Sequence, residues 1–137
     1  MIKKVNFLES ELKNLTLELK TKANGREGVD FLVGTNEIHL QSIDLDTSKR
    51  SIKIAKQDLG ELKDNLFIAI VVILEKEPKA VYLIPSKDLV QSDSNIFTEN
   101  EIALMPSLSN WEIKVSTNTI PELAKYALEN MISELKS

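Results

Sequence analysis

Asp44 and Asp46 lie two positions apart in a stretch that reads as a β-strand. Side chains two residues apart point to the same face of a strand, so the two carboxylates could chelate a cation. The intervening Leu45 equally fits a strand whose outer face carries solvated acids and whose inner face is apolar. The alternation favours the solvated interpretation, and the chelating one stays open.

His39 is the only histidine, and the chain has no cysteine. One histidine cannot build a histidine metal site, and thiolate sites, disulfides and cysteine nucleophiles are excluded. A serine–histidine pair is formally possible, but no Gly-x-Ser-x-Gly elbow is present. No glycine-rich phosphate loop is present either.

The composition indicates one globular domain covering residues 1–137, with 42% hydrophobic and 28% charged residues. The net charge of −4 disfavours nucleic acid as a partner, because a binder must neutralise phosphates with basic side chains. The densest basic cluster fits a solvated hairpin edge better than a domain-scale nucleic-acid footprint. It contains Lys49, Arg50, Lys53 and Lys56.

No apolar run approaches the roughly 20 residues that a membrane helix needs. The start of the chain leads into an amphipathic pattern and lacks the apolar centre of a signal peptide. We therefore expect a cytoplasmic protein with no membrane partner. We also expect no cofactor.

The first predicted helix covers residues 6–22. Asn6 with Glu9 resembles a capping box, and Asn24-Gly25 is a plausible helix end. Four leucines recur on one stripe, which is either a packing face or the seam of a homodimer. These interface candidates are Leu8, Leu12, Leu15 and Leu19.

A second helix is predicted over residues 119–135, where Thr119 and Glu122 form another capping-box signature. Between the two helices the chain alternates short apolar runs with turns, which predicts strands. These runs cover residues 29–33, 36–46, 52–54, 66–74, 80–84 and 111–115. The order predicts an α/β (α+β) fold, with a central mixed sheet of about five to six strands flanked by an N-terminal and a C-terminal helix.

The strand over residues 36–46 has a defect in its alternation. Ile38 and Leu40 share one parity, whereas Ile43 and Leu45 share the other. A strict period of two cannot bury both pairs on one face. One extra residue near Gln41-Ser42, in a β-bulge, would restore a single buried face.

The element order and its short motifs resemble the PD-(D/E)XK nuclease-like superfamily. The matching segments are Gly28-Val29-Asp30, Gln41-Ser42-Ile43, the apolar strand 66–74 and the strand that ends in Ile84-Pro85. The resemblance covers roughly residues 5–90 and implies a restriction-endonuclease-like fold. It leaves residues 91–110 without a role.

In that superfamily, two acidic groups on adjacent strands hold a divalent cation, usually magnesium. A lysine assists the attacking water and stabilises the developing charge. The resemblance places Asp30 as the first acid and Gln41 at the second position, so these are the candidate metal and catalytic residues. Ile43 stands where the lysine belongs and has neither a charge nor a donor.

Lys53 is the candidate for a relocated lysine, because it lies on the next predicted strand. Its neighbours Ile52 and Ile54 have the parity of buried residues, which points Lys53 outward.

Trp111 shares its parity with other apolar residues of the last strand, which favours a place in the core or at its edge. It is also an interface candidate, since tryptophan often anchors protein contacts.

The resemblance with a degenerate site favours a non-catalytic domain that binds another protein, or its own copy, in a small bacterial system. A divalent-metal-dependent nuclease with a relocated lysine is the first alternative, and only that alternative requires Mg²⁺. An acidic immunity or antitoxin-like binding protein is the second, in which electrostatic complementarity steers association.

Overall fold

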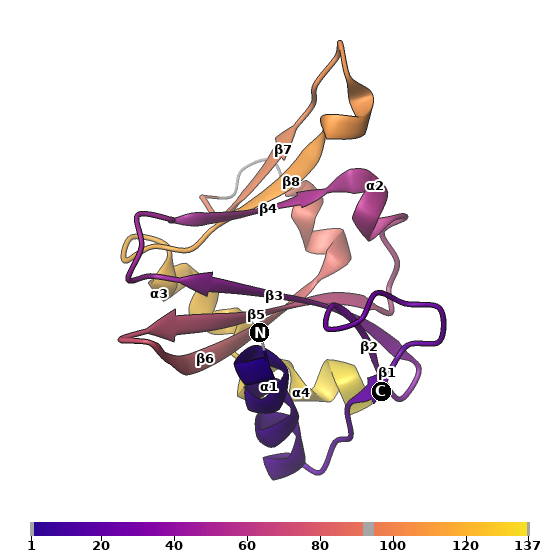
Figure 1. Cartoon of the computed structure of the whole chain (residues 1–137), viewed down its shortest axis with the longest axis vertical. Helices are drawn as coiled ribbons and strands as arrows, with labels where there is room; N and C mark the ends of the chain where they lie inside the picture. Colours follow the sequence, from indigo (N-terminus) through magenta and orange to yellow (C-terminus); the bar gives the residue numbers. More distant parts are fainter. Residues whose placement is uncertain (1, 92–94, 137) are drawn as a thin grey trace.

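Three layers build the fold in the computed structural model, which describes residues 2–91 and 95–136 (Figure 1). The middle layer is a five-stranded sheet in the order β1-β2-β3-β5-β6. Its strands are β1 (Lys20–Thr21), β2 (Asp30–Val33), β3 (Asn36–Asp44), β5 (Leu66–Leu74) and β6 (Glu77–Pro85). β3 and β5 run parallel, and the other neighbours are antiparallel, so the sheet is mixed.

A second sheet, of three strands, lies on one side of the first and has the order β4-β8-β7. It consists of β4 (Ser51–Ala55), β7 (Phe97–Asn100) and β8 (Asn110–Lys114). The terminal helices lie on the other side of the five-stranded sheet (Figure 1). These terminal helices are α1 (Ile2–Asn14) and α4 (Leu128–Lys136). The chain also has five shorter helical segments, which are α2 (Lys56–Leu59), α3 (Ile120–Leu123), η1 (Ser86–Val90), η2 (Pro106–Leu108) and η3 (Ala124–Tyr126).

The predicted α+β class, the mixed sheet of five to six strands and the helices at both ends are confirmed. The sequence did not predict the division into two sheets. The strands expected over residues 52–54 and 111–115 pair with each other, Ile52 opposite Ile113 and Ile54 opposite Trp111. Their inward side chains are buried, so this small sheet covers a face of the central sheet that would otherwise be exposed.

No bulge occurs at Gln41-Ser42, and that prediction was wrong. The register of β3 on β5 runs unbroken from Glu37 opposite Leu66 to Asp44 opposite Ile73. Because β3 is covered on both faces, residues of both parities are buried along it, and no correction of phase is needed. A register shift occurs instead between β5 and β6, at Val72/Ile73.

The first helix ends at Asn14, eight residues before the predicted end. Thr16 adopts a left-handed φ of 61°. The N–H of Leu17 donates to the carbonyl of Leu12 (2.8 Å), and that of Thr16 donates to Lys13 (3.0 Å). This is a Schellman motif, which terminates a helix without needing glycine. Asn6 lies inside the helix and not at its cap.

The leucine stripe of the first helix packs on the chain's own sheet, since α1 contacts β3, β5 and β6. Leu8 and Leu12 are each 1% exposed, and Leu19, which follows the helix, is also buried. Leu15 is half-buried against the same core. The stripe therefore completes the monomer's core.

The last predicted helix is divided. α3 and η3 are followed by Ala127 in an extended conformation (φ −54°, ψ 142°), which pairs with Tyr82 before α4 begins. The Thr119 side chain makes no capping bond to the helix. Its hydroxyl instead donates to the carbonyl of Lys114 (2.9 Å) and accepts from the N–H of Ser116 (2.9 Å).

Among the described segments, every helix is too short or too polar to cross a lipid bilayer. The two strands β7 and β8 extend beyond the rest of the molecule as a hairpin arm (Figure 1). We call these strands and the loop between them the β7–β8 arm.

We expect Ile70→Asp to prevent folding. Ile70 lies in the middle of β5 and is fully buried, and an unpaired buried carboxylate should cost at least about 4 kcal/mol. Leu104→Asp is the matched control, because Leu104 is 96% exposed on the β7–β8 arm. Circular dichroism and thermal melting should show that the Leu104→Asp control is folded and that Ile70→Asp is unfolded. If both proteins melted cooperatively at the same temperature, this account of the core would be contradicted.

Candidate functional site

Asp30 opens β2 and is held by the turn that precedes it. The chain leaves β1 and reverses, with the N–H groups of Val29 and Asp30 donating to the carbonyl of Arg26 (3.1 and 3.0 Å). Gly25 is required for this close approach, because a Cβ there would lie 2.8 Å from the Cβ of Asp30. The turn therefore places Arg26 in direct contact with the Asp30 carboxylate.

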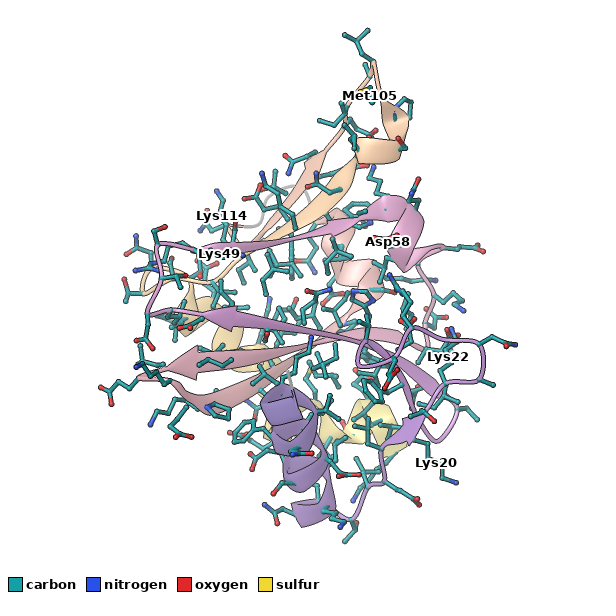
Figure 2. All side chains as sticks on the ribbon, viewed as in Figure 1. Lys20, Lys22, Lys49, Asp58, Met105 and Lys114 are labelled. Carbon is teal, nitrogen blue, oxygen red and sulfur yellow. The ribbon has the colours of Figure 1, made fainter. Side chains whose placement is uncertain are left out.

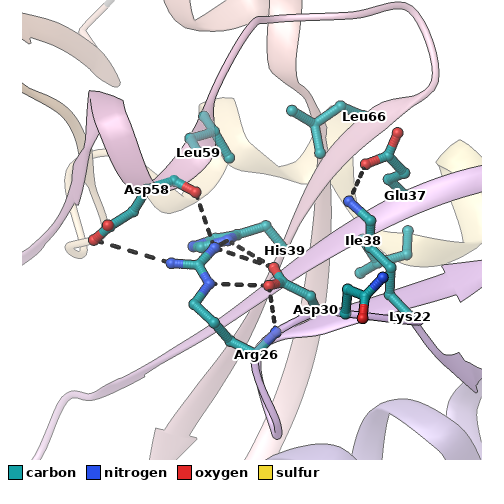
Figure 3. Close-up of a pocket in the computed structure, with 10 residues that line it drawn as sticks. Lys22, Arg26, Asp30, Glu37, Ile38, His39, Asp58, Leu59 and Leu66 are labelled. Carbon is teal, nitrogen blue, oxygen red and sulfur yellow. Dashed lines mark hydrogen bonds and ion pairs between the residues drawn. The ribbon is translucent and has the colours of Figure 1, made fainter.

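Arg26 fills the coordination positions of that carboxylate (Figure 3). Its backbone N–H donates to Asp30 Oδ2 at 2.8 Å, Nε donates to the same oxygen at 2.9 Å, and Nη2 donates to Oδ1 at 3.1 Å. Such forked, charge-assisted bonds are among the strongest side-chain interactions in proteins. Both oxygens of Asp30 are consequently engaged by one cation of the chain itself.

The same guanidinium reaches two further partners. Nη2 donates to the backbone carbonyl of Asp58 in α2 (3.0 Å), and the Asp58 carboxylate lies 4.0 Å from Nη1. Nη2 also lies 3.2 Å from His39 Nδ1. Arg26 thus connects the turn before β2 with β3 and with α2, which are far apart in the sequence.

His39 lies between two donor groups. Arg26 Nη2 is 3.2 Å from Nδ1, and the Gln41 amide nitrogen is 2.8 Å from Nε2. A neutral imidazole has one acceptor nitrogen, so the ring accepts from one of these two groups. His39 is 3% exposed, and its ring is accordingly held neutral between Arg26 and Gln41.

The pKa values follow from this geometry. Burial on its own would raise the pKa of Asp30, but the hydrogen bonds from Arg26 outweigh it and the pKa lies below its ordinary value. The pKa of Arg26 is raised, chiefly by its hydrogen bond to Asp30. The pKa of His39 is lowered, first by burial and then by the nearby charge of Arg26.

Arg26, Asp30 and His39 line a pocket whose volume is ≈ 180 Å³, and a second ion cluster borders it. Glu37 Oε1 accepts from Lys22 Nζ and Oε2 accepts from Lys63 Nζ, both at 2.5 Å. Hydrogen bonds from these two lysines lower the pKa of Glu37. Asp30 of β2 and Glu37 of β3 are therefore paired with basic side chains of the protein.

The residues that the resemblance proposed for magnesium do not fit that ion. Both oxygens of Asp30 already accept hydrogen bonds from Arg26, and Gln41, which brings no charge, hydrogen-bonds to His39. Ile43 is 2% exposed, so the position of the expected lysine lies in the core. Lys53 is exposed on β4, between the buried Ile52 and Ile54.

Asp44 and Asp46 serve the local backbone. The two oxygens of Asp46 accept from the N–H groups of Glu75 and Lys76 (3.0 and 2.9 Å), which form the β5–β6 turn. Those two bonds lower the pKa of Asp46. Asp44 Oδ1 accepts from the N–H of Asp46 (2.9 Å), so the pair makes a turn and not a chelate.

Trp111 is 7% exposed on β8, facing inward. Lys56 Nζ lies 4.6 Å from the centroid of its ring, in cation–π geometry, and also bonds the carboxylates of Glu99 and Glu101. The tryptophan therefore supports the base of the β7–β8 arm.

Arg26 and Asp58 were absent from the sequence-based candidates. The spacing of Arg26 and Asp30, four residues apart across a turn with two glycines, is the signal that could have indicated an ion pair. For Asp58 the sequence carries no comparable signal, because only the folding of α2 toward β3 brings it close.

Within residues 2–91 and 95–136, no group of three or more histidine or acidic side chains is arranged to hold a metal ion. Comparison with models of known protein families finds no match, and comparison with curated proteins finds none. The chemistry of the site therefore has to be argued from its own contacts.

We expect the free energy of unfolding to fall in two steps as the pH is lowered. His39 has a lower pKa in the fold than its ordinary 6.5, so the unfolded chain takes up the proton first. Its stabilisation is complete above about pH 6.5 and is lost progressively below it. Asp30, whose pKa is lowered from 3.8, contributes above that pH and loses its contribution as the pH falls further.

His39→Gln is the variant that separates the two steps, because glutamine does not titrate and can still hydrogen-bond. Urea denaturation of both proteins between about pH 8 and pH 3 should show the upper step only in the wild type. No other histidine is present to produce that step. Equal pH dependence of the two proteins between pH 7 and pH 5 would contradict a neutral, buried His39.

Proposed function

We propose that this chain is a non-catalytic domain with a nuclease-like fold, which acts by binding another protein through the tip of the β7–β8 arm. The observation that carries the proposal is the exposure of that tip. All eight residues from 101 to 108 are exposed, and Leu104 is 96% exposed. Contiguous exposed apolar patches rimmed by polar residues mark protein or membrane contact sites.

The apolar side chains are gathered at the far end of the arm. Figure 2 shows Met105 there, away from both sheets. The four large apolar residues of the tip, all at least 38% exposed, are Ile102, Leu104, Met105 and Leu108. Side chains in this position add little to the core, and a partner that covered them would remove their apolar surface from water.

The tip is already ordered by its own hydrogen bonds. The N–H of Met105 donates to the carbonyl of Ile102 (3.2 Å), and that of Leu108 donates to Met105 (2.9 Å). The Ser109 hydroxyl accepts from the N–H of Ile102 (2.9 Å) and closes the loop. A loop that is held in one conformation loses less entropy when it binds, which favours a specific protein contact.

The charges at the base of the tip favour a protein over an anionic lipid surface. Glu99 and Glu101 flank the tip, and Lys56 is the basic side chain that bonds both. Two acidic side chains and one basic side chain give the base of the tip a negative net charge, which anionic headgroups repel. An apolar cleft on a protein meets no such repulsion.

The absence of catalysis is supported by the contacts of Asp30. A phosphodiesterase of the resembling superfamily needs a free acidic pair for the cation and a basic group at the attacking water. Here Arg26 occupies the acid, and Ile43 and Lys53 supply no inward cation. The nuclease alternative therefore has less support than binding.

The acidic immunity-like alternative would also act by association, with carboxylates and not apolar side chains at the contact. The net charge of −4 is its support. Mapping the contact residues distinguishes the two forms of binding.

Calorimetric titration with Mg²⁺, and then with Mn²⁺, should give no saturable heat. The reason is that metal binding would have to displace the Arg26 guanidinium from both oxygens of Asp30. The matched control is Asp30→Asn, and each protein is also incubated with DNA and RNA plus metal. Saturable binding that disappears in Asp30→Asn, together with cleavage, would restore the enzyme.

A photo-crosslinking amino acid in place of Met105 should give a discrete adduct in cells, and the same amino acid in place of the exposed Glu18 should not. The mass of the adduct distinguishes a second copy of this 15.4 kDa chain from another protein. Adding Leu104→Asp should reduce the adduct about tenfold or more, as for a central contact residue. Equal crosslinking from both positions would refute the tip as the binding surface.

A further inference from the structure

We propose that a pocket between β3 and β4 binds the phosphate group of a small molecule. We call it the β3–β4 pocket. It lies where the chain passes from the five-stranded to the three-stranded sheet, and its volume is ≈ 590 Å³. Its lining residues are Gln41, Ser42, Ile43, Ser48, Lys49, Arg50, Ser51, Ile52 and Lys53.

The lining of this pocket is cationic without compensation. It contains three basic side chains and no acidic one, although the whole chain has a net charge of −4. Two other pockets of the described surface mix both signs. The pocket around Arg26 includes Asp30, Glu37 and Asp58, and the pocket between β6 and α4 includes Asp64, Asp88 and Glu134.

The three cations are not used in ion pairs. Among the described residues, no carboxylate lies within 4.0 Å of Lys49, Arg50 or Lys53. Arg50 Nη1 donates to the backbone carbonyls of Thr47 (2.7 Å) and Lys49 (2.6 Å). These bonds fix the guanidinium over the loop and leave its other nitrogens to donate to a ligand.

The carboxylates nearest to the pocket already accept hydrogen bonds from other groups of the protein. Asp46 accepts from the β5–β6 turn, and Asp44 accepts from the N–H of Asp46. Glu112, directly opposite Lys53 on β8, accepts from the Asn100 amide (3.0 Å). Hydrogen bonds from Asn100 and Ser51 are the first causes that lower the pKa of Glu112, and the charge of Lys53 lowers it further from beyond ion-pair distance.

Neutral donors and an apolar floor complete the site. Ser42 and Ser48 bring hydroxyl groups. Ile43 and Ile52 are buried beneath them. A guanidinium fork with hydroxyl donors suits the tetrahedral oxygens of a phosphate, and the apolar floor suits an attached organic group.

Size and charge favour a small molecule over a nucleic acid. The volume is within the range of roughly 300–1,000 Å³ found for small-ligand pockets. A nucleic-acid surface is a domain-scale basic face, whereas these cations lie in one connection and the strand that follows it. Figure 2 places Lys49 in that connection, where β4 begins. The pocket shares no lining residue with the tip of the β7–β8 arm, so the inference is independent of the proposed function.

The test uses pyrophosphate and adenosine monophosphate as probes, with adenosine as the uncharged comparison. Amide chemical shifts of the full chain are followed by NMR at low salt, where electrostatic binding is strongest. We expect saturable shifts at residues 41–53 with both phosphates and none with adenosine. The double variant Lys49→Gln/Arg50→Gln should weaken binding by about tenfold or more.

The matched control is Lys13→Gln/Lys20→Gln, which removes the same charge from exposed positions outside the pocket. It should bind as the wild type does, and thermal melting checks that both variants are folded. The proposal is overturned if neither phosphate gives saturable shifts, or if both double variants weaken binding equally. Binding of a single-stranded oligonucleotide at residues 41–53 without binding of either small phosphate would also overturn it, in favour of a nucleic-acid surface.

Discussion

The complete burial of β5 is the constraint on which the rest of the structure depends. Seven of its nine residues are buried, and residues of both parities are among them. A strand of this kind needs a neighbour on each edge and a covering layer on each face. β3 and β6 satisfy its backbone on the two edges. The terminal helices cover one face and the β4-β8-β7 sheet covers the other (Figure 1).

That requirement also accounts for the environment of His39. Because β3 is the parallel neighbour of β5, it too is covered on both faces, and a polar side chain on it must find partners inside the protein. His39 finds Arg26 and Gln41, and Arg26 in turn holds Asp30 and the carbonyl of Asp58. The chain thus neutralises a partly buried carboxylate with its own guanidinium. The same contacts that stabilise the fold engage both oxygens of Asp30.

The surfaces that remain open are of two different kinds. The tip of the β7–β8 arm is apolar and projects from the protein, which suits contact with another macromolecule. The β3–β4 pocket is concave and cationic, which suits a small anion. The two lie on different elements, so a ligand in the pocket and a protein on the arm do not compete for the same residues.

The sequence by itself determined what depends on neighbours along the chain: the apolar strand β5, the α+β class, the outward direction of Lys53 and the absence of a lysine at Ile43. It misplaced the end of the first helix, because the Schellman motif uses Thr16 where glycine is the usual signal. It also predicted a bulge in β3, because alternation within one strand cannot reveal that both faces are covered. The contacts that Arg26 makes with His39 and Asp58 were decided by tertiary structure alone. Arg26, His39 and Asp58 come together from three elements, and a contact between distant segments leaves no pattern in a local stretch of sequence.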